Sequence, residues 1–230
     1  MGYSVIIPAA GVGKRMKHHR NKLFIELQGQ SILERTLNIF ETHPLCDEII
    51  IAVNKQDIHD IEQLRAQYTK IKPLVEGGVE RQHSIYHALK HIENDIVMVH
   101  DAARPFVKHE QINMLYQRVV EGQHAVLGVR AKDTIKMVDE HKIIKSTLDR
   151  NSIYHIQTPQ AFTKKVLTKA YDDAFSKGIL GTDDASLVEQ NGIAVGIVEG
   201  TDTNIKITTP IDIQLGELIL QNMAKRNERR

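Results

Sequence analysis

The sequence predicts an α/β fold of the doubly wound kind, in which helices cover both faces of a mostly parallel sheet. Short apolar segments alternate with amphipathic segments along most of the chain, as in successive β-α-β units. The first apolar segment runs straight into a turn of small residues, which is typical of the carboxyl end of a buried strand. A length of 230 residues fits one large domain, so we treat 1–230 as a single unit.

The first half of the chain contains four apolar segments that predict buried strands. They are continuous rather than alternating, as expected of strands that are covered on both faces. Between them, apolar residues recur at helical spacing, which predicts amphipathic helices. In order, the predicted elements are a strand at 3–8, a helix at 32–40, a strand at 48–53, a helix at 56–68, a strand at 72–75, a helix at 85–92 and a strand at 95–99.

The second half of the chain interrupts this rhythm once. Two alternating segments surround a polar turn at 139–142, which predicts a β-hairpin arm over 133–157. An isolated hairpin is marginally stable in water, so we expect the arm to pack on a second subunit. The remaining predicted elements are a helix at 109–121, a strand at 124–129, a helix at 164–176, a loop at 178–182, a helix at 183–191, a strand at 193–198 and a last helix from Pro210.

Composition excludes several functional classes. The 30 Lys and Arg residues nearly balance 29 Asp and Glu, and a net charge of +1 disfavours a bulk nucleic-acid binder. Cys46, the single cysteine, cannot form an intrachain disulfide, and the 12 histidines show no zinc-binding spacing. No segment approaches the ~20 apolar residues of a membrane span, and the first apolar run lacks the charged start of a signal peptide. We therefore expect a cytoplasmic protein with no nucleic-acid or membrane partner.

The turn after the first predicted strand contains small residues and cations. It reads Pro8-Ala9-Ala10-Gly11-Val12-Gly13-Lys14-Arg15-Met16, and Lys22 follows shortly after it. Small residues let backbone N–H groups approach phosphates, and Arg15 and Lys22 could hold a triphosphate. The spacing matches neither the dinucleotide-binding G-x-G-x-x-G nor the P-loop G-x-x-x-x-G-K-[ST], which weakens both interpretations. Taken alone, the glycines fit a plain tight turn equally well.

Further motifs follow this turn along the chain. They are Leu27-x-Gly29, Gly77-Gly78-x-Glu80-Arg81-x-x-Ser84, His100-Asp101-Ala102-Ala103-Arg104-Pro105, Asp133-Thr134-Ile135-Lys136, Asp149-Arg150, Gln157-Thr158-Pro159-Gln160, Thr182-Asp183-Asp184-Ala185 and Asn204-Ile205-Lys206-Ile207-Thr208-x-Pro210. In this order they resemble the family of 2-C-methyl-D-erythritol 4-phosphate cytidylyltransferases, nucleotidyltransferases with a Rossmann-like fold that serve isoprene biosynthesis by the non-mevalonate pathway. The resemblance implies an enzyme that transfers the cytidylyl group of CTP to methylerythritol phosphate and releases pyrophosphate.

The resemblance also implies the residues of the site. Arg15, Lys22 and Lys206 would be the catalytic cations. The nucleotide would contact Pro8, Ala9, Ala10, Gly11, Gly13, Arg15, Lys22, Gly77, Gly78, Ser84, Asp101, Ala102 and Lys206. The acceptor would contact Asp101, Arg104, Thr134, Arg150, Thr158 and Thr182, with Thr134 and Arg150 supplied across a homodimer by the 133–157 arm. Asp101 is also the candidate metal ligand, for a Mg²⁺ carried largely by the CTP phosphates.

Two alternatives remain at this stage. The acceptor could be another polyol phosphate such as ribitol 5-phosphate, although Ala10, Ala103 and Asp149 favour methylerythritol phosphate on the family pattern. The chain could also be a non-catalytic nucleotide-binding protein, although all the expected cations are present. One position departs from the pattern: Val79 stands where many relatives have Asp. The attacking phosphate is mostly ionised near neutral pH, so the absence of an obvious catalytic triad agrees with the implied reaction.

Overall fold

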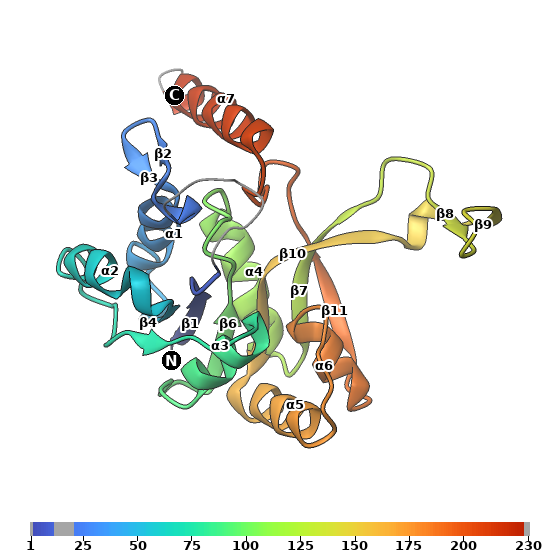
Figure 1. The fold of residues 1–230 in the computed structure, drawn as a ribbon, viewed down its shortest axis with the longest axis horizontal. Helices are drawn as coiled ribbons and strands as arrows, with labels where there is room; N and C mark the ends of the chain where they lie inside the picture. The colour runs from blue at the N-terminus through green and yellow to red at the C-terminus, as the bar shows by residue number, and fades with distance from the viewer. Residues whose placement is uncertain (1, 12–20, 228–230) are drawn as a thin grey trace.

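The structure is a computed structural model that describes residues 2–11 and 21–227 (Figure 1). At its centre is a seven-stranded sheet with the order β11-β7-β10-β6-β1-β4-β5. Its strands are β1 (Tyr3–Pro8), β4 (Cys46–Val53), β5 (Val75–Glu76), β6 (Ile96–Val99), β7 (His124–Arg130), β10 (Tyr154–Thr163) and β11 (Val195–Glu199). Two short antiparallel pairs lie outside this sheet, namely β2 (Glu26–Leu27) with β3 (Gln30–Ser31) and β8 (Lys136–Val138) with β9 (Ile144–Thr147).

The central sheet is mostly parallel, as the sequence predicts. Strand β10 runs antiparallel to both of its neighbours, β6 and β7. The other neighbouring pairs in the sheet, from β11–β7 to β4–β5, are parallel. Because the chain passes from β1 to β4 and β5 on one side and then returns to β6 on the other, the order of strands reverses beside β1.

Helices cover both faces of the sheet. Alternate side chains of β1 point to opposite faces: Val5 and Ile7 join one core cluster and Ile6 joins the other. The first cluster packs against α1 (Ile32–Glu41), α2 (Ile58–Arg65), α4 (His109–Val120) and α7 (Pro210–Asn227). The second packs against α3 (Arg81–Leu89), α5 (Lys164–Ser176) and α6 (Asp184–Gln190). Within residues 2–11 and 21–227, the remaining elements are the short 3-10 helices η2 (Lys22–Phe24), η3 (Lys55–Asp57) and η4 (Arg150–Ser152).

The strand expected at 72–75 is the clearest local difference. Strand β5 contains only Val75 and Glu76, and Ile71 forms a single isolated bridge to Ile49. Pro73 lies between these two contacts. Because proline has no N–H to donate, it cannot continue a hydrogen-bonded ladder.

The arm expected at 133–157 is shorter in the structure. Its paired residues are β8 and β9, which extend away from the main sheet in Figure 1. The Asp139 side chain forms the turn between them by accepting hydrogen bonds from the amides of His141 and Ile143. The segment from Tyr154 onward belongs to β10, where Tyr154 pairs with Arg130 of β7. The irregularity between Ile156 and Gln160 contains Pro159, so the sequence pattern of one long strand is broken in the middle.

Candidate active site

The candidate site lies where the loops after β6, β1 and β4–β5 meet. In open α/β sheets, ligands bind beyond the carboxyl ends of the strands, at the point where the strand order reverses. Here that point is between β1 and β6. A cavity of about 490 Å³, within the usual size of a ligand site, opens there. It is lined by Pro8, Ala9, Ala10, Gly11, Lys22, Leu23, Gly78, Val79, Glu80, Arg81, Ser84, Asp101, Ala102, Ala103, Lys206 and Thr208.

One wall of the cavity is built by close contact between two backbone segments. A side chain at Gly77 would put its Cβ 2.3 Å from the Cβ of Ala10, so only glycine allows this approach. The next residue, Gly78, donates its N–H to the Ser84 hydroxyl at 3.1 Å. Ser84 lies near the start of α3 and is within 3.2 Å of the Glu80 carbonyl oxygen. The small-residue turn after β1 and the 77–78 segment therefore form one continuous surface.

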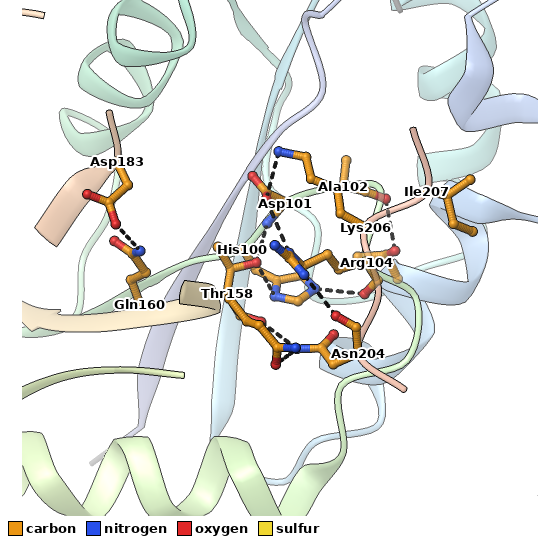
Figure 2. Close-up of polar contacts among 12 residues, drawn as sticks. His100, Asp101, Ala102, Arg104, Thr158, Gln160, Asp183, Asn204, Lys206 and Ile207 are labelled. Atoms are coloured by element: carbon orange, nitrogen blue, oxygen red, sulfur yellow. Dashed lines mark hydrogen bonds and ion pairs between the residues drawn. The ribbon is translucent and has the colours of Figure 1, made fainter. Parts of the chain in front are cut away.

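The cavity lining also carries a cluster of charges centred on Asp101, shown in part in Figure 2. The Lys206 ammonium lies 2.9 Å from Oδ2 of Asp101, and the Nε atoms of Arg104 and Arg81 lie 3.4 Å from Oδ2 and Oδ1 respectively. Burial by itself would raise the pKa of the Asp101 carboxyl, but the charges of Arg81, Lys206 and Arg104 outweigh it and hold that pKa well below its usual value. Asp101 is therefore a carboxylate whose negative charge is shared by three cations.

Arg81 connects this cluster to the helices that pack against the second core cluster. Its guanidinium donates to the fully buried Asp184 at 2.8 Å, and Asp184 also accepts a hydrogen bond from the Tyr171 hydroxyl. Helix α3 is thereby tied to α6 and α5 directly beside the cavity. Arg81 is not among the site residues expected from the sequence. The one signal was its place in the Gly77-Gly78 motif at the start of a helix.

Lys22 brings a further positive charge to the cavity. It begins η2, and its ammonium donates to the backbone oxygen of Ile207 at 2.7 Å. This contact joins the loop after β1 to the segment before α7, which also carries Lys206. Among the described residues, the four cations Lys22, Arg81, Arg104 and Lys206 thus lie at or directly behind the cavity lining, with the three carboxylates Glu80, Asp101 and Asp184. The surplus of positive charge suits a polyanionic ligand.

Behind Asp101 is a buried polar pair, His100 and Thr158. The Asp101 amide donates to the Thr158 hydroxyl at 3.0 Å, and this hydroxyl lies 3.1 Å from Nδ1 of His100. The other ring nitrogen, Nε2, lies 2.9 Å from the Arg104 carbonyl oxygen. Burial lowers the pKa of His100 to about 4, so the ring is neutral near pH 7. Thr158, expected as an acceptor contact, is buried behind the cavity wall.

The structure brings most of the expected nucleotide-site residues together. The residues that line the cavity are Pro8, Ala9, Ala10, Gly11, Lys22, Gly78, Ser84, Asp101, Ala102 and Lys206. Arg104 contacts Asp101 from behind the lining. Thr182, in the loop before α6, and Thr134 and Arg150, at the base of the arm, are exposed and do not line this cavity. Gly13 and Arg15 lie outside the described residues.

The donor set fits a metal ion that a bound phosphate chain would carry. Asp101 is a buried carboxylate at the cavity wall, although Lys206 and Arg104 already contact its Oδ2. Among residues 2–11 and 21–227, no group of three or more His, Cys, Asp or Glu side chains gathers as a metal site. Mg²⁺ typically takes one or two carboxylates and completes its shell with phosphate and water. Asp101 can therefore supply one oxygen ligand to Mg²⁺, and phosphate and water oxygens would complete the coordination shell.

Comparisons with known proteins agree on one family. The family model for 2-C-methyl-D-erythritol 4-phosphate cytidylyltransferase (IspD) matches residues 3–222. The chain is 50% identical to the protein of that name from Bacillus velezensis, over 96% of this chain and 97% of the other. It is 47% identical to the one from Lysinibacillus sphaericus, over 97% and 98%.

Solved structures of similar proteins share the fold. A 4-diphosphocytidyl-2C-methyl-D-erythritol synthase from Anaerococcus prevotii superposes with a TM-score of 0.87 at 33% identity, covering 96% of both chains. A 2-C-methyl-D-erythritol 4-phosphate cytidylyltransferase from Thermus thermophilus superposes with a TM-score of 0.81 at 31% identity. The match covers 96% of this chain and 100% of the other. In the part of this chain that the structure describes, no helix is long and apolar enough to cross a bilayer.

Proposed function

The chain belongs to the 2-C-methyl-D-erythritol 4-phosphate cytidylyltransferase family, and from this we infer that it transfers the cytidylyl group of CTP to 2-C-methyl-D-erythritol 4-phosphate. The products are 4-diphosphocytidyl-2-C-methyl-D-erythritol and pyrophosphate. The observation that carries this inference is the cation-rich cavity around Asp101, whose lining combines Lys22 and Lys206 with the small residues Ala9, Ala10 and Gly78. A cavity with this charge attracts two anionic reactants more strongly than it attracts a neutral reactant.

The reaction needs positioning more than acid–base chemistry. A phosphate oxygen of the acceptor attacks the α-phosphorus of CTP, a new P–O bond forms there, and the bond to the bridging oxygen of pyrophosphate breaks. The attacking phosphate is mostly dianionic near pH 7, since its second pKa is about 6, so no proton has to be removed first. The protein must hold two anions in line and stabilise the charge that builds on the α-phosphate.

We assign these tasks to the residues of the cavity. Lys22 and Lys206 would contact the phosphates of CTP and the attacking phosphate, together with Arg15, which lies outside the described residues. The glycine-lined wall would take the cytosine and ribose, with Ala9, Ala10, Gly78 and Ser84 nearest the base. Asp101 and Arg104 would orient the acceptor. Mg²⁺, held mainly by the phosphates and at one position by Asp101, would neutralise phosphate charge.

We further propose that the active unit is a homodimer in which the arm of one subunit completes the site of the other. The arm exposes four large apolar side chains, Met137, Val138, Ile143 and Ile144, with exposed fractions of 50%, 47%, 64% and 59%. A small hairpin with this much apolar surface is better explained by a partner than by solvent. Thr134 and Arg150 at its base would then act on the acceptor in the partner's site. A cytoplasmic location would fit this pathway step.

The test of the proposed function is release of pyrophosphate from CTP and Mg²⁺ with different acceptors. We expect release with methylerythritol 4-phosphate and little with ribitol 5-phosphate, and little when UTP or ATP replaces CTP. Release with ribitol 5-phosphate would preserve the chemistry and change the acceptor. No release with any pair, from folded protein that still binds CTP, would contradict an enzymatic function.

A further inference from the structure

Gln82 is a buried side chain in the first turn of α3, and no step of the proposed reaction uses it. It is only 6% exposed. Its amide nitrogen donates to the Ile179 carbonyl oxygen at 3.0 Å, and its amide oxygen accepts from the Gly181 N–H at 2.9 Å. One carboxamide thus bonds the C=O of one residue and the N–H of the residue two places on, as a neighbouring strand would. Gln82 therefore holds the loop between α5 and α6 in one conformation.

The same loop fits closely against α6 on its other side. A side chain at Gly181 would put its Cβ 2.5 Å from the buried side chain of Leu187, so the loop lies directly on that helix. Arg81, which precedes Gln82, adds an ion pair with Asp184 at 2.8 Å. The first turn of α3 is therefore joined to the segment 179–184 by three polar contacts, and this segment has little room to move.

Thr182 follows this contact directly and is held from its other side as well. The next residue, Asp183, is the N-cap of α6, and its Oδ1 accepts from the Ser186 amide at 2.9 Å. Its Oδ2 accepts from the side chain of Gln160 at 2.8 Å (Figure 2). The backbone of Thr182 is thus fixed on both sides, whereas the residue itself is exposed. A hydroxyl on a fixed backbone suits ligand contact, because little is left to be ordered when the ligand binds.

We propose that Gln82 is a positioning residue, which holds Thr182 in place for the acceptor without touching the acceptor itself. The proposal rests on the proposed function and on the acceptor contact that the family resemblance implies for Thr182. Gln82 does not line the cavity, and both of its hydrogen bonds go to the loop, so it acts through that loop. Because α3 also carries Ser84, which we assign to the base, one helix supports contacts to both substrates.

The test compares Gln82→Met, which keeps the size of the side chain and removes both hydrogen bonds, with Gln111→Met. Gln111 is the matched control, because it is a glutamine in the first turn of α4 and is only 3% exposed. In Gln82→Met we expect kcat/KM for the acceptor to fall about 5- to 20-fold, the loss of about one hydrogen bond to the acceptor. The affinity for CTP, measured by calorimetry without acceptor, should stay within about twofold, the margin for independent sites. Acceptor kinetics equal to those of the control would overturn the proposal.

Thr182→Val separates positioning from a purely structural role, because it removes the hydroxyl that Gln82 would hold in place. We expect this variant to lose at least as much kcat/KM for the acceptor as Gln82→Met. The combined variant should lose little more than Thr182→Val alone, since the position of an absent hydroxyl no longer matters. Additive losses, or no effect of Thr182→Val, would contradict the positioning role. If Gln82→Met does not fold, Gln82→Asn, whose amide is too short to bond both partners, takes its place in the same comparisons. Wild-type protein that is inactive with methylerythritol phosphate would instead contradict the proposed function.

Discussion

At the scale of single residues, the site depends on charges that are held by contacts rather than left free in solvent. Lys206 is paired with Asp101, and Lys22 donates to the Ile207 backbone. Such contacts reduce the side-chain entropy that would be lost when a phosphate binds. They also set the cost of removing any one cation, because its partner is left behind. Lys22 is the simplest to test, since its ammonium donates to the backbone carbonyl of Ile207.

We expect Lys22→Ala to lower kcat by about 10²- to 10³-fold, the effect of removing one group that stabilises transition-state charge. The fold should persist, because Lys22 is only partly buried and its side chain lines the cavity. Steady-state rates with CTP and the acceptor, together with a thermal melt, measure both effects. The matched control is Lys55→Ala, which removes an exposed lysine paired with Glu76 at the surface. Turnover of Lys22→Ala close to that of the control would contradict the catalytic role.

At the scale of elements, the cavity depends on how closely the turn after β1 approaches the segment after β5. Gly77 allows this approach, and its N–H also donates to the Val53 carbonyl at the end of β4. The separation is fixed by backbone on both sides, so an added methyl group cannot be absorbed by a flexible side chain.

In Gly77→Ala we expect the KM for CTP to rise about tenfold or more, because an overpacking cost of about 1–3 kcal/mol would displace one wall of the nucleotide site. Titration of CTP into each variant by calorimetry measures the effect without relying on turnover. Gly196→Ala in β11 is the control, since the nearest atom to its new Cβ is 3.7 Å away. Equal CTP affinities for the two variants would show that the approach at Gly77 does not shape the site.

The elements also show what the sequence can predict. Continuous apolar runs correctly predicted β1, β4 and β6, because burial on both faces leaves a signal in the sequence itself. The antiparallel placement of β10 left no such signal, because Pro159 divides the strand and the pattern before it resembles a hairpin.

In the candidate site, too, the sequence predicts only those features that leave a local pattern. Motifs nominated Asp101, Lys206 and Lys22, whose side chains reach the cavity. The pairs Arg81–Asp184 and His100–Thr158 join residues 103 and 58 positions apart, and only folding brings them together.

At the scale of the whole molecule, buried neutral histidines couple stability to pH. His43 is fully buried beside His109, with ring centroids 4.8 Å apart. Burial, reinforced by the charge of His109, lowers the pKa of His43 from 6.5 to about 4. Between these two values the unfolded chain binds more protons than the folded one, so stability rises with pH in this window. The contribution is complete above about pH 6.5 and is lost as the pH falls toward 4.

We expect the free energy of unfolding of the wild type to fall between pH 7.5 and 5.0, with His43 accounting for about 2 kcal/mol of the loss. Urea titrations of wild type and His43→Phe at the two pH values measure this share as a difference of differences. The variant removes the titrating group and keeps an aromatic ring. Each protein is compared with itself at the two pH values, so a difference in absolute stability between variant and wild type cancels. His100, whose pKa is also lowered to about 4, should keep some pH dependence in the variant. Identical pH dependence in both proteins would contradict the assignment to His43.

The proposed homodimer predicts that two inactive variants restore activity when their subunits are combined in one dimer. If the arm of one subunit serves the partner's cavity, each active site combines Lys22 of one chain with Arg150 of the other. In a hybrid of Lys22→Ala and Arg150→Ala subunits, one site then carries both changes and the other carries neither. We expect purified hybrids, isolated through two different tags, to show about half of the wild-type activity although each parent dimer is nearly inactive.

The reciprocal hybrid distinguishes this arrangement from an arm that serves its own chain. It pairs a wild-type subunit with a subunit that carries both Lys22→Ala and Arg150→Ala. An arm acting on the partner leaves one change in each site, so this hybrid should be nearly inactive. An arm acting within its own chain reverses both results, because the doubly changed chain then concentrates the damage in one site and spares the other. The arm's exposed apolar residues, and its extension away from the rest of the molecule in Figure 1, favour the first outcome.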